Sequence, residues 1–374
     1  MARLFVRTVV AIFALAAVTS AAQAQVSCGA TITEKVTATA DLNCTGFDPG
    51  FTINGGSVDL DGHSVTVDPG DTAIALIGTG SKLFNGSISL GAGSDGVFLG
   101  GGGVHKVEGI AVNGGAHGFY GTSGKNKLKN CSATGSTARG YYFTSDKVSI
   151  SRSSAVFCDV GFLMQGDGHK LVENVVDGDD IGSTGIFIDG DASKLNRNIV
   201  HGTDSAGILI DGTGNKLVQN AVARTEGTGF SITGNANKLT KNSSAENDDD
   251  GFAIVGSDNK LTQNVAVDNG VFGVGVVTGS GNNVNATVAN NNGSAGIAIG
   301  LSSGNSLKSN ITMGNDTGVA IVGSGTNSVS KTIAVGNTTR DLSDDAASCG
   351  TNVWSKNIFN TSIAGIVVGH SCID

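Results

Sequence analysis

Acidic residues recur at a fixed interval in the middle of the chain. Asp189 and Asp211 lie 22 residues apart, and each ends an apolar segment of the same type, GIFID and GILID. If the chain coils once every 22 residues, the two positions stack at the strand spacing of about 4.8 Å. Two carboxylates at that spacing can share a proton or a cation, which suits glycoside hydrolysis or Ca²⁺ binding.

More carboxylates share a second position, just before each apolar segment. The predicted calcium site combines both positions and consists of Asp189, Asp204, Asp211, Glu226 and Asp248. Stacked like charges repel one another unless water or a cation relieves the repulsion. The alternative is a solvated acidic edge that holds no ion.

Two basic residues are candidates to assist an acid or a base at this position. His169 and Arg197 flank Asp189 in the sequence. Perturbed carboxylates with such neighbours occur at catalytic sites. The candidate catalytic residues are therefore Asp189, Asp211, His169 and Arg197. The alternative is that the lone histidine and arginine are turn or surface residues of the repeat.

Aromatic and amide side chains occupy the outward positions of neighbouring repeats. The predicted ligand-binding residues are Tyr120, Tyr142, Gln165 and Phe187. Aromatic faces beside hydroxyl, amide and carboxylate groups can bind sugar rings, which need both stacking and polar contacts. The alternative is an apolar stripe that the end of the chain or a partner covers.

These residues belong to a repeat that is clearest between positions 185 and 272. Its four copies are GIFIDGDASKLNRNIVHGTDSA, GILIDGTGNKLVQNAVARTEGT, GFSITGNANKLTKNSSAENDDD and GFAIVGSDNKLTQNVAVDNGVF. Apolar residues alternate after the leading glycine, as in a strand, and Gly and Asn clusters mark turns. Short strands cannot bury their apolar faces alone, so the repeats must stack as the turns of a solenoid.

Equivalent positions in the stacked repeats form three further columns. The tenth place holds the inward leucines Leu171, Leu195, Leu217, Leu239 and Leu261. The thirteenth place holds Asn174, Asn198, Asn220, Asn242 and Asn264, an asparagine ladder with a structural role. The ninth place holds Lys170, Lys194, Lys216, Lys238 and Lys260. This lysine column is interpreted as a solvated face that discourages aggregation, with an anion-binding stripe as the alternative.

The composition excludes some classes of protein. The chain has 374 residues, 58 Gly, two Pro and a formal net charge of −9. Many glycines with few prolines suit a fold of many turns and uninterrupted strands. The negative charge argues against a nucleic-acid partner, whose phosphates require a basic surface.

The N-terminus predicts export. Arg3 and Arg7 precede the short apolar run VVAIFALAAV, and an Ala-Gln-Ala cleavage site ends at residue 24. This is the pattern of a secretory signal peptide, and no later run is long enough to insert in a membrane. We expect a secreted or periplasmic protein in which disulfides form. The predicted disulfides are Cys28–Cys44 and Cys349–Cys372, with Cys131 and Cys158 free and buried.

The domain organisation follows from where the repeat is interrupted. We expect a signal peptide at 1–24, an N-terminal cap at 25–49, solenoid repeats at 50–340 and a C-terminal cap at 341–374. The fold class is all-β: one solenoid of about thirteen rungs, ~60 Å long at ~4.8 Å per rung.

The opening CGATIT…ADLNC, the VDLDGHSVT rung, the GIxIxG…NKLxxN repeats and the segment CGTNVWSKNIF resemble secreted right-handed parallel β-helix proteins, whose shape is that of pectate lyases. The resemblance implies the fold and a link to polysaccharides, because this fold hosts lyases, hydrolases, epimerases and adhesins. The sequence lacks both the DPHD motif of mannuronan epimerases and the GHG and RIK motifs of polygalacturonases. Copper binding, known in periplasmic β-helix proteins, is disfavoured because Met164 and Met313 lie far apart and the histidines are scattered.

We therefore expect a protein that binds carbohydrate or acts as a surface scaffold, with an acidic polysaccharide or a cell-surface glycan as partner. The alternative is a polysaccharide lyase or glycoside hydrolase that uses the acidic patch. A third alternative is a purely structural secreted protein. No cofactor is expected apart from Ca²⁺.

Overall fold

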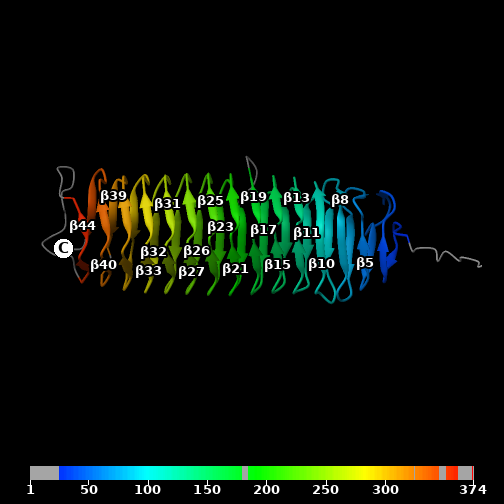
Figure 1. Ribbon diagram of the computed structural model, residues 1–374, viewed down its shortest axis with the longest axis horizontal. Coiled ribbons are helices and arrows are strands. Elements are labelled where there is room, and N and C mark those ends of the chain that lie inside the picture. The colour runs from blue at the N-terminus through cyan, green and yellow to red at the C-terminus, as the bar shows by residue number, and fades with distance from the viewer. Residues whose placement is uncertain (1–24, 179–183, 324, 345–350, 361–372, 374) are drawn as a thin grey trace, which may run out of the picture.

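Short parallel strands wind into one long coil. The computed structural model describes residues 25–178, 184–323, 325–344, 351–360 and 373. Within these residues every regular element is a β-strand, and each strand pairs in parallel with its equivalent in the next rung. The result is a rod whose rungs are stacked side by side along its length (Figure 1). This confirms the predicted parallel β-helix.

The first strand of every rung belongs to one 16-stranded sheet, here called sheet A. Its strands in order are β1 (Thr31–Ile32), β4 (Phe51–Asn54), β7 (Thr72–Ile77), β9 (Asp95–Leu99), β11 (His117–Gly121), β14 (Arg139–Phe143), β17 (Val160–Gln165), β20 (Thr184–Asp189), β23 (Ala206–Asp211), β26 (Phe230–Thr233), β29 (Phe252–Val255), β32 (Val274–Ser280), β35 (Ala295–Ile299), β39 (Thr317–Ile321) and β42 (Arg340–Asp344). A short strand, β36 (Ser302–Ser303), pairs with β32 beside this order.

The second and third strands of the rungs form the other faces of the coil. The second strands are β2 (Lys35–Thr37), β5 (Ser57–Asp59), β12 (Lys127–Lys129), β15 (Ser149–Ser151), β18 (Lys170–Val172), β21 (Lys194–Asn196), β24 (Lys216–Val218), β27 (Lys238–Thr240), β30 (Lys260–Thr262), β33 (Asn283–Asn285), β37 (Ser306–Lys308), β40 (Ser328–Ser330) and β43 (Val353–Ser355). The third strands are β3 (Leu42–Asn43), β6 (Ser64–Thr66), β13 (Ser132–Thr134), β16 (Ser154–Val156), β19 (Val175–Asp177), β22 (Ile199–His201), β25 (Ala221–Ala223), β28 (Ser243–Ala245), β31 (Val265–Val267), β34 (Val288–Asn290), β38 (Ile311–Met313), β41 (Ile333–Val335) and β44 (Ile358–Phe359). The longer β8 (Lys82–Ser89) and β10 (Lys106–Asn113) run through both positions.

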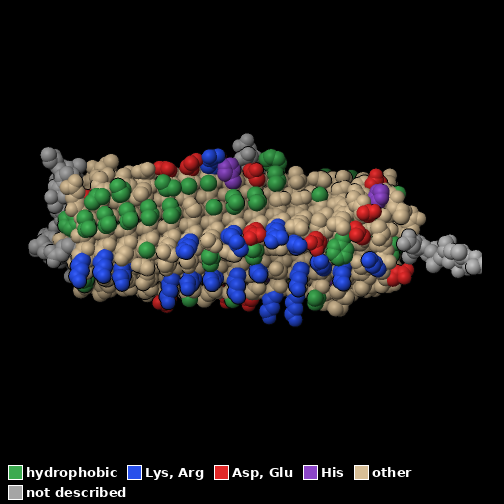
Figure 2. Space-filling view, in the orientation of Figure 1, with side chains coloured by type: hydrophobic (Ala, Val, Ile, Leu, Met, Phe, Trp, Pro, Cys, Tyr) green, Lys and Arg blue, Asp and Glu red, His purple; other side chains and the backbone are tan. Residues whose placement is uncertain are grey.

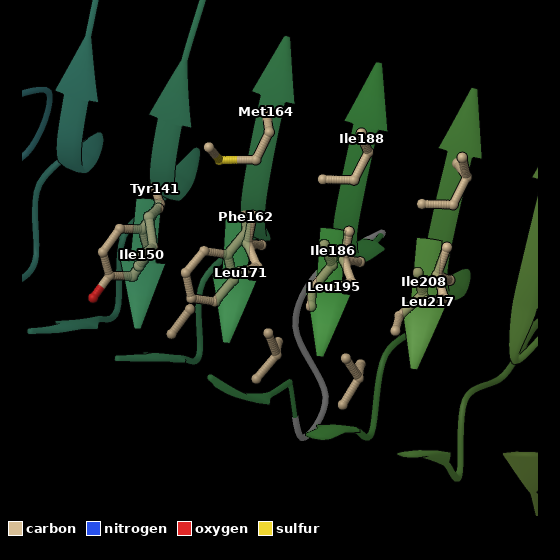
Figure 3. Packing of buried hydrophobic residues seen from close by; sticks show 14 of the residues in the cluster. Tyr141, Ile150, Phe162, Met164, Leu171, Ile186, Ile188, Leu195, Ile208 and Leu217 are labelled. Carbon is tan, nitrogen blue, oxygen red and sulfur yellow. The ribbon is translucent and has the colours of Figure 1, made fainter. Parts of the chain in front are cut away.

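The core runs along the inside of the coil. Leu171, Leu195 and Leu217 are fully buried one above the other, as the repeat predicts. Burying each such side chain contributes about 2 kcal/mol. On the first strands, Tyr141 of β14 stacks on Phe162 of β17 with ring centroids 4.4 Å apart. Figure 3 shows these side chains pointing inward from successive rungs.

Buried amide ladders hold the corners of the coil together. The Asn198 Nδ2 donates to Asn220 Oδ1 at 2.9 Å, and the Asn220 Nδ2 donates to Asn242 Oδ1 at 3.0 Å. Each of these amides also bonds a backbone carbonyl or N–H. The predicted asparagine ladder is confirmed. Two further ladders occupy the other corners, from Asn215 to Asn352 and from Asn247 to Asn337.

Strand pairing continues into both segments predicted as caps. β1 pairs with β4 at one end, and β42 pairs with β39 at the other. A disulfide links Cys28 to Cys44, whereas Cys131 and Cys158 are free and buried. The signal peptide, Cys349 and Cys372 lie outside the described residues, so those predictions stay predictions. Within the described part of the chain, no helix has the length and apolarity needed to cross a bilayer.

Candidate functional site

Aromatic rings stack in register on the outer face of sheet A. Phe98 of β9 pairs with Tyr120 of β11, and Tyr120 pairs with Tyr142 of β14. Their ring centroids lie 5.5 Å and 5.2 Å apart, and all three side chains are half-buried. Leu163 and Phe187 continue the column on β17 and β20. The structure therefore places Tyr120, Tyr142 and Phe187 in one column.

A polar column stands beside the rings, one place before the leading glycine of each rung. Asp95, His117 and Arg139 pair in register on β9, β11 and β14. The His117 Nδ1 lies 2.7 Å from Asp95 Oδ1, and the Arg139 Nη1 lies 3.3 Å from His117 Nε2. The guanidinium of Arg139 also lies over the Tyr142 ring, 4.4 Å from its centroid.

The partners of His117 determine its protonation pattern. A guanidinium can only donate hydrogen bonds, so the Nε2 of His117 must accept from Arg139. An ionised carboxylate can only accept hydrogen bonds, so the Nδ1–H of His117 must donate the hydrogen bond to Asp95. In the neutral imidazole these partners select the Nδ1–H tautomer, with the Nε2 lone pair directed at Arg139.

Tyr142 connects the rings to the acidic end of the strands. Its hydroxyl donates to Gln165 Oε1 at 3.2 Å, and the Gln165 Nε2 donates to Asp189 Oδ2 at 3.0 Å. Asp189 in turn pairs in register with Asp211. One continuous array thus runs from Asp95 to Asp211, and we call it the sheet A site.

Gly118, between His117 and Tyr120, lets sheet A pack closely against the third strand of the coil. A Cβ at Gly118 would lie 2.6 Å from the Cβ of Ala133 and 2.7 Å from the carbonyl oxygen of Gly140. Real Cβ atoms do not make such contacts. The leading glycine therefore lets sheet A approach the third strand closely, which keeps the neighbouring side chains in register.

The structure separates the five carboxylates predicted as a calcium site. Asp204 precedes β23, whereas Asp211 ends it, so the two groups lie at opposite ends of a six-residue strand. Glu226 and Asp248 share the turn column of Asp204, and all three are exposed. Among the described residues, no three His, Cys, Asp or Glu side chains gather closely enough to hold a metal ion. This arrangement does not support one calcium site that combines both columns.

The two basic candidates lie away from Asp189. His169 is fully buried in the turn after β17, where desolvation lowers the pKa of its imidazole. Arg197 lies in the turn after β21, with its Nη2 3.3 Å from Glu173 Oε1. Neither residue reaches the outer face of sheet A. His117 and Arg139 supply the basic groups of the site instead.

Three residues of the sheet A site share a sequence position that is absent from the predicted site. Asp95, His117 and Arg139 each stand directly before a leading glycine, at Gly96, Gly118 and Gly140. His117 lies three residues before Tyr120, so strict strand alternation would place it on the inward face. Two consecutive buried residues separate them in β11, and this break in the alternation puts both side chains on the outer face, which the spacing alone does not predict.

Comparisons with known proteins identify the fold class first. A model of the right-handed beta helix region matches residues 184–338. The solved structures that resemble this chain share the fold at low sequence identity. A double mutant of the periplasmic alginate epimerase AlgG is 14% identical with a TM-score of 0.54, over 83% of this chain and 85% of that chain. The A-module of mannuronan C-5 epimerase AlgE4 from Azotobacter vinelandii is 12% identical with a TM-score of 0.50, over 82% and 86%.

A third structure is the catalytic unit of a GH87 alpha-1,3-glucanase from Streptomyces thermodiastaticus. It is 13% identical with a TM-score of 0.50, over 82% of this chain and 63% of that chain. No curated protein matches the sequence significantly. These likenesses establish the right-handed β-helix fold.

The family follows from a second match. A model described as periplasmic copper-binding protein (NosD) matches residues 60–247, just over half of the chain. The chain therefore belongs to the NosD family, and it is a secreted or periplasmic protein. This confirms the predicted location.

The described residues do not fit a copper site. The soft donors Cys131, Cys158 and Met164 are buried inside the coil, while Met313 is exposed on β38, six rungs from Met164. Burial raises the pKa of Cys131 to about 11 and also raises that of Cys158, which disfavours the thiolates that bind metals. With no metal-binding group among the described side chains, no step of the proposed function uses copper.

Proposed function

We propose that the protein binds carbohydrate on the outer face of sheet A. The observation that carries the proposal is the stack of Phe98, Tyr120 and Tyr142 beside charged and amide groups. Sugar rings pack their C–H faces on aromatic side chains and use hydroxyls for polar contacts. Gln165 and Asp189 supply donors and acceptors at one edge of the stack, and Arg139 supplies a cation at the other.

The shape of the face suits a chain better than a small molecule. The site spans successive rungs along the rod, and strand spacing repeats every ~4.8 Å. Rungs of similar length leave few loops to wall off a deep pocket. An extended oligosaccharide that lies along the rod can contact several rungs at once. The structural neighbours, an alginate epimerase and an alpha-1,3-glucanase, support a polysaccharide ligand.

The Asp95, His117 and Arg139 column favours a second candidate function, acid–base chemistry on a bound polysaccharide. A carboxylate that orients a histidine is a common feature of general-base sites. A sugar carboxylate that draws Arg139 away would free the Nε2 lone pair of His117 to accept a proton. The second candidate is therefore a lyase that acts on the same face as the proposed binding site, with His117 rather than the acidic pair as the base.

Binding at the sheet A site is tested by calorimetry with a neutral alpha-1,3-glucan oligosaccharide, and alginate and polygalacturonate oligosaccharides are titrated in parallel to detect cleavage. We expect Tyr142→Ala to weaken binding at least tenfold, because it removes the ring that stacks on Tyr120 and contacts Gln165. Ser231→Ala is the matched control. Ser231 lies in the same outward column as Tyr142 and Leu163, three rungs beyond Leu163 and away from the aromatic stack. Equal affinities of the wild-type and Tyr142→Ala proteins would overturn the proposal. Release of unsaturated ends during the titrations would identify the lyase, and the His117→Gln variant should then release none.

A further inference from the structure

A strip of lysines runs along the second strands, away from the sheet A site. Register pairing joins Lys170, Lys194, Lys216, Lys238 and Lys260 across β18, β21, β24, β27 and β30. All five side chains are exposed, and Figure 2 shows basic side chains aligned in rows along the rod. The ammonium groups repeat once per rung, at the strand spacing of ~4.8 Å. We call this column the lysine strip.

Carboxylates neutralise other basic residues of the coil but not the lysine strip. Glu108 contacts Lys106 and Lys129 at 2.8 Å each, and these ammonium groups hold the pKa of Glu108 at about 2. Glu173 bridges Arg152 and Arg197 in the same manner. Among the described residues, none of the five strip lysines has a carboxylate within ion-pair distance. Like charges in register repel, so the strip favours a negatively charged partner.

A shallow groove lies along the strip and gives it a floor. The groove has a volume of about 380 Å³ over β18, β21 and β24. Val172 and Val218 supply apolar surface, and Asn196 between them supplies an amide. Lysines line one side of the groove, and Arg197 lies on the turn at the other. The groove thus combines an apolar floor with cations along its length.

We propose that the lysine strip binds an extended acidic polysaccharide, a uronic-acid polymer, parallel to the rod axis. Such a polymer carries one carboxylate per sugar, and a sugar ring with its glycosidic bond is comparable in length with one rung of ~4.8 Å. Successive carboxylates therefore face successive lysines, while the ring faces rest on Val172 and Val218. This surface lies on the second strands, so the inference does not depend on the sheet A site.

A nucleic acid fits the strip less well. Duplex phosphates are spaced ~3.4 Å apart along each strand and follow a helical path. Single strands are held by aromatic stacking, whereas the outward residues along the groove are valine, asparagine and threonine.

The test uses the mature protein with polygalacturonate, neutral dextran and single-stranded DNA as probes, each at several salt concentrations. The variant Lys194→Gln, Lys216→Gln, Lys238→Gln removes the centre of the strip and keeps the side-chain stems. The control variant Lys125→Gln, Lys147→Gln, Lys331→Gln makes the same change of net charge at turns elsewhere. We expect wild-type protein to bind polygalacturonate with an affinity that falls as salt rises, and not to bind dextran.

The strip variant should lose at least tenfold in affinity for polygalacturonate, while the control variant changes less than twofold. The strip variant should unfold at the same temperature or higher, because it loses only repulsion. Equal loss in both variants would reduce the effect to net charge and overturn the proposal. DNA bound as tightly as polygalacturonate would also overturn it. The Tyr142→Ala variant should keep polygalacturonate binding at the strip, so failure here and failure of the sheet A proposal are distinguishable.

Discussion

Asp250 illustrates how one residue can oppose the stability of the coil. It is buried at the turn before β29, where its Oδ1 accepts a hydrogen bond from the Phe272 backbone N–H at 2.9 Å. Desolvation raises the pKa of Asp250 to about 6, from an ordinary value of 3.8. The folded state therefore holds this proton more tightly than the unfolded chain does. The stabilisation that comes from the protonated Asp250 carboxyl is complete below about pH 4 and is lost as pH rises through 6.

An uncharged side chain at this position should remove the pH dependence. We expect Asp250→Asn to stabilise the protein by on the order of 1–3 kcal/mol at pH 7.5, because the amide oxygen still accepts from Phe272 without a buried charge. At pH 4 the two proteins should unfold alike. Thermal unfolding at both pH values measures the effect, with the exposed Asp248→Asn as the control. A variant that melts lower than wild type at pH 7.5 would show that the fold needs the charge.

Stacked corner residues determine how the strands join into rungs. Asn220 accepts hydrogen bonds from the backbone and side chain of Asn198 and donates to Leu195 and Asn242. Asn220→Ala leaves buried donors and acceptors without partners, and we expect it to cost about 2–4 kcal/mol. Chemical denaturation measures the loss. Gln219→Ala, at the exposed neighbouring position, should change stability by less than about 0.5 kcal/mol. Similar losses in both variants would contradict a special role for the ladder.

The elements were easier to predict than the contacts between columns. Strand alternation and the 22-residue interval suffice to pair Tyr142 with Tyr120 and Asp189 with Asp211. In a solenoid the register between rungs follows from counting residues per repeat. The same counting gives no information about distance along a strand, so it does not separate Asp204, before β23, from Asp211 at its end. It also cannot tell that His169 is buried at a corner and that His117 lies beside Asp95. The positions of the His169 and His117 side chains depend on which side of each turn faces the core, and turn geometry varies between rungs.

Interactions in the whole molecule run almost entirely between neighbouring rungs. The disulfide Cys28–Cys44 closes a loop with a sequence separation of 16 at the first rung. Contacts in such an array are local, so damage at one end does not spread far. The ends are therefore the places where covalent or packing reinforcement is most useful.

Replacing Cys28 and Cys44 by serine should loosen the end of the rod without unfolding its centre. A loop of this length is worth about 3 kcal/mol in the chain-entropy description. We expect faster amide hydrogen exchange in β1 to β6 and unchanged exchange in β20 to β30. Cys158→Ala, which removes a buried free thiol, serves as the control for the loss of sulfur alone. Uniformly faster exchange along the rod would mean that the coil unfolds as one cooperative unit.

The unvarying register of the central rungs also makes the length of the molecule adjustable. Removing residues 207–228 takes out one complete copy of the repeat and brings Asn198 next to Asn242 and Lys194 next to Lys238. Every ladder closes again with the same chemical partners, and the rod shortens by a single strand spacing, ~4.8 Å. Duplication of a copy would lengthen it by the same step. Gene-level gain or loss of whole repeats can thus tune the reach of the lysine strip while keeping the part of the sheet A site that runs from Asp95 to Asp189.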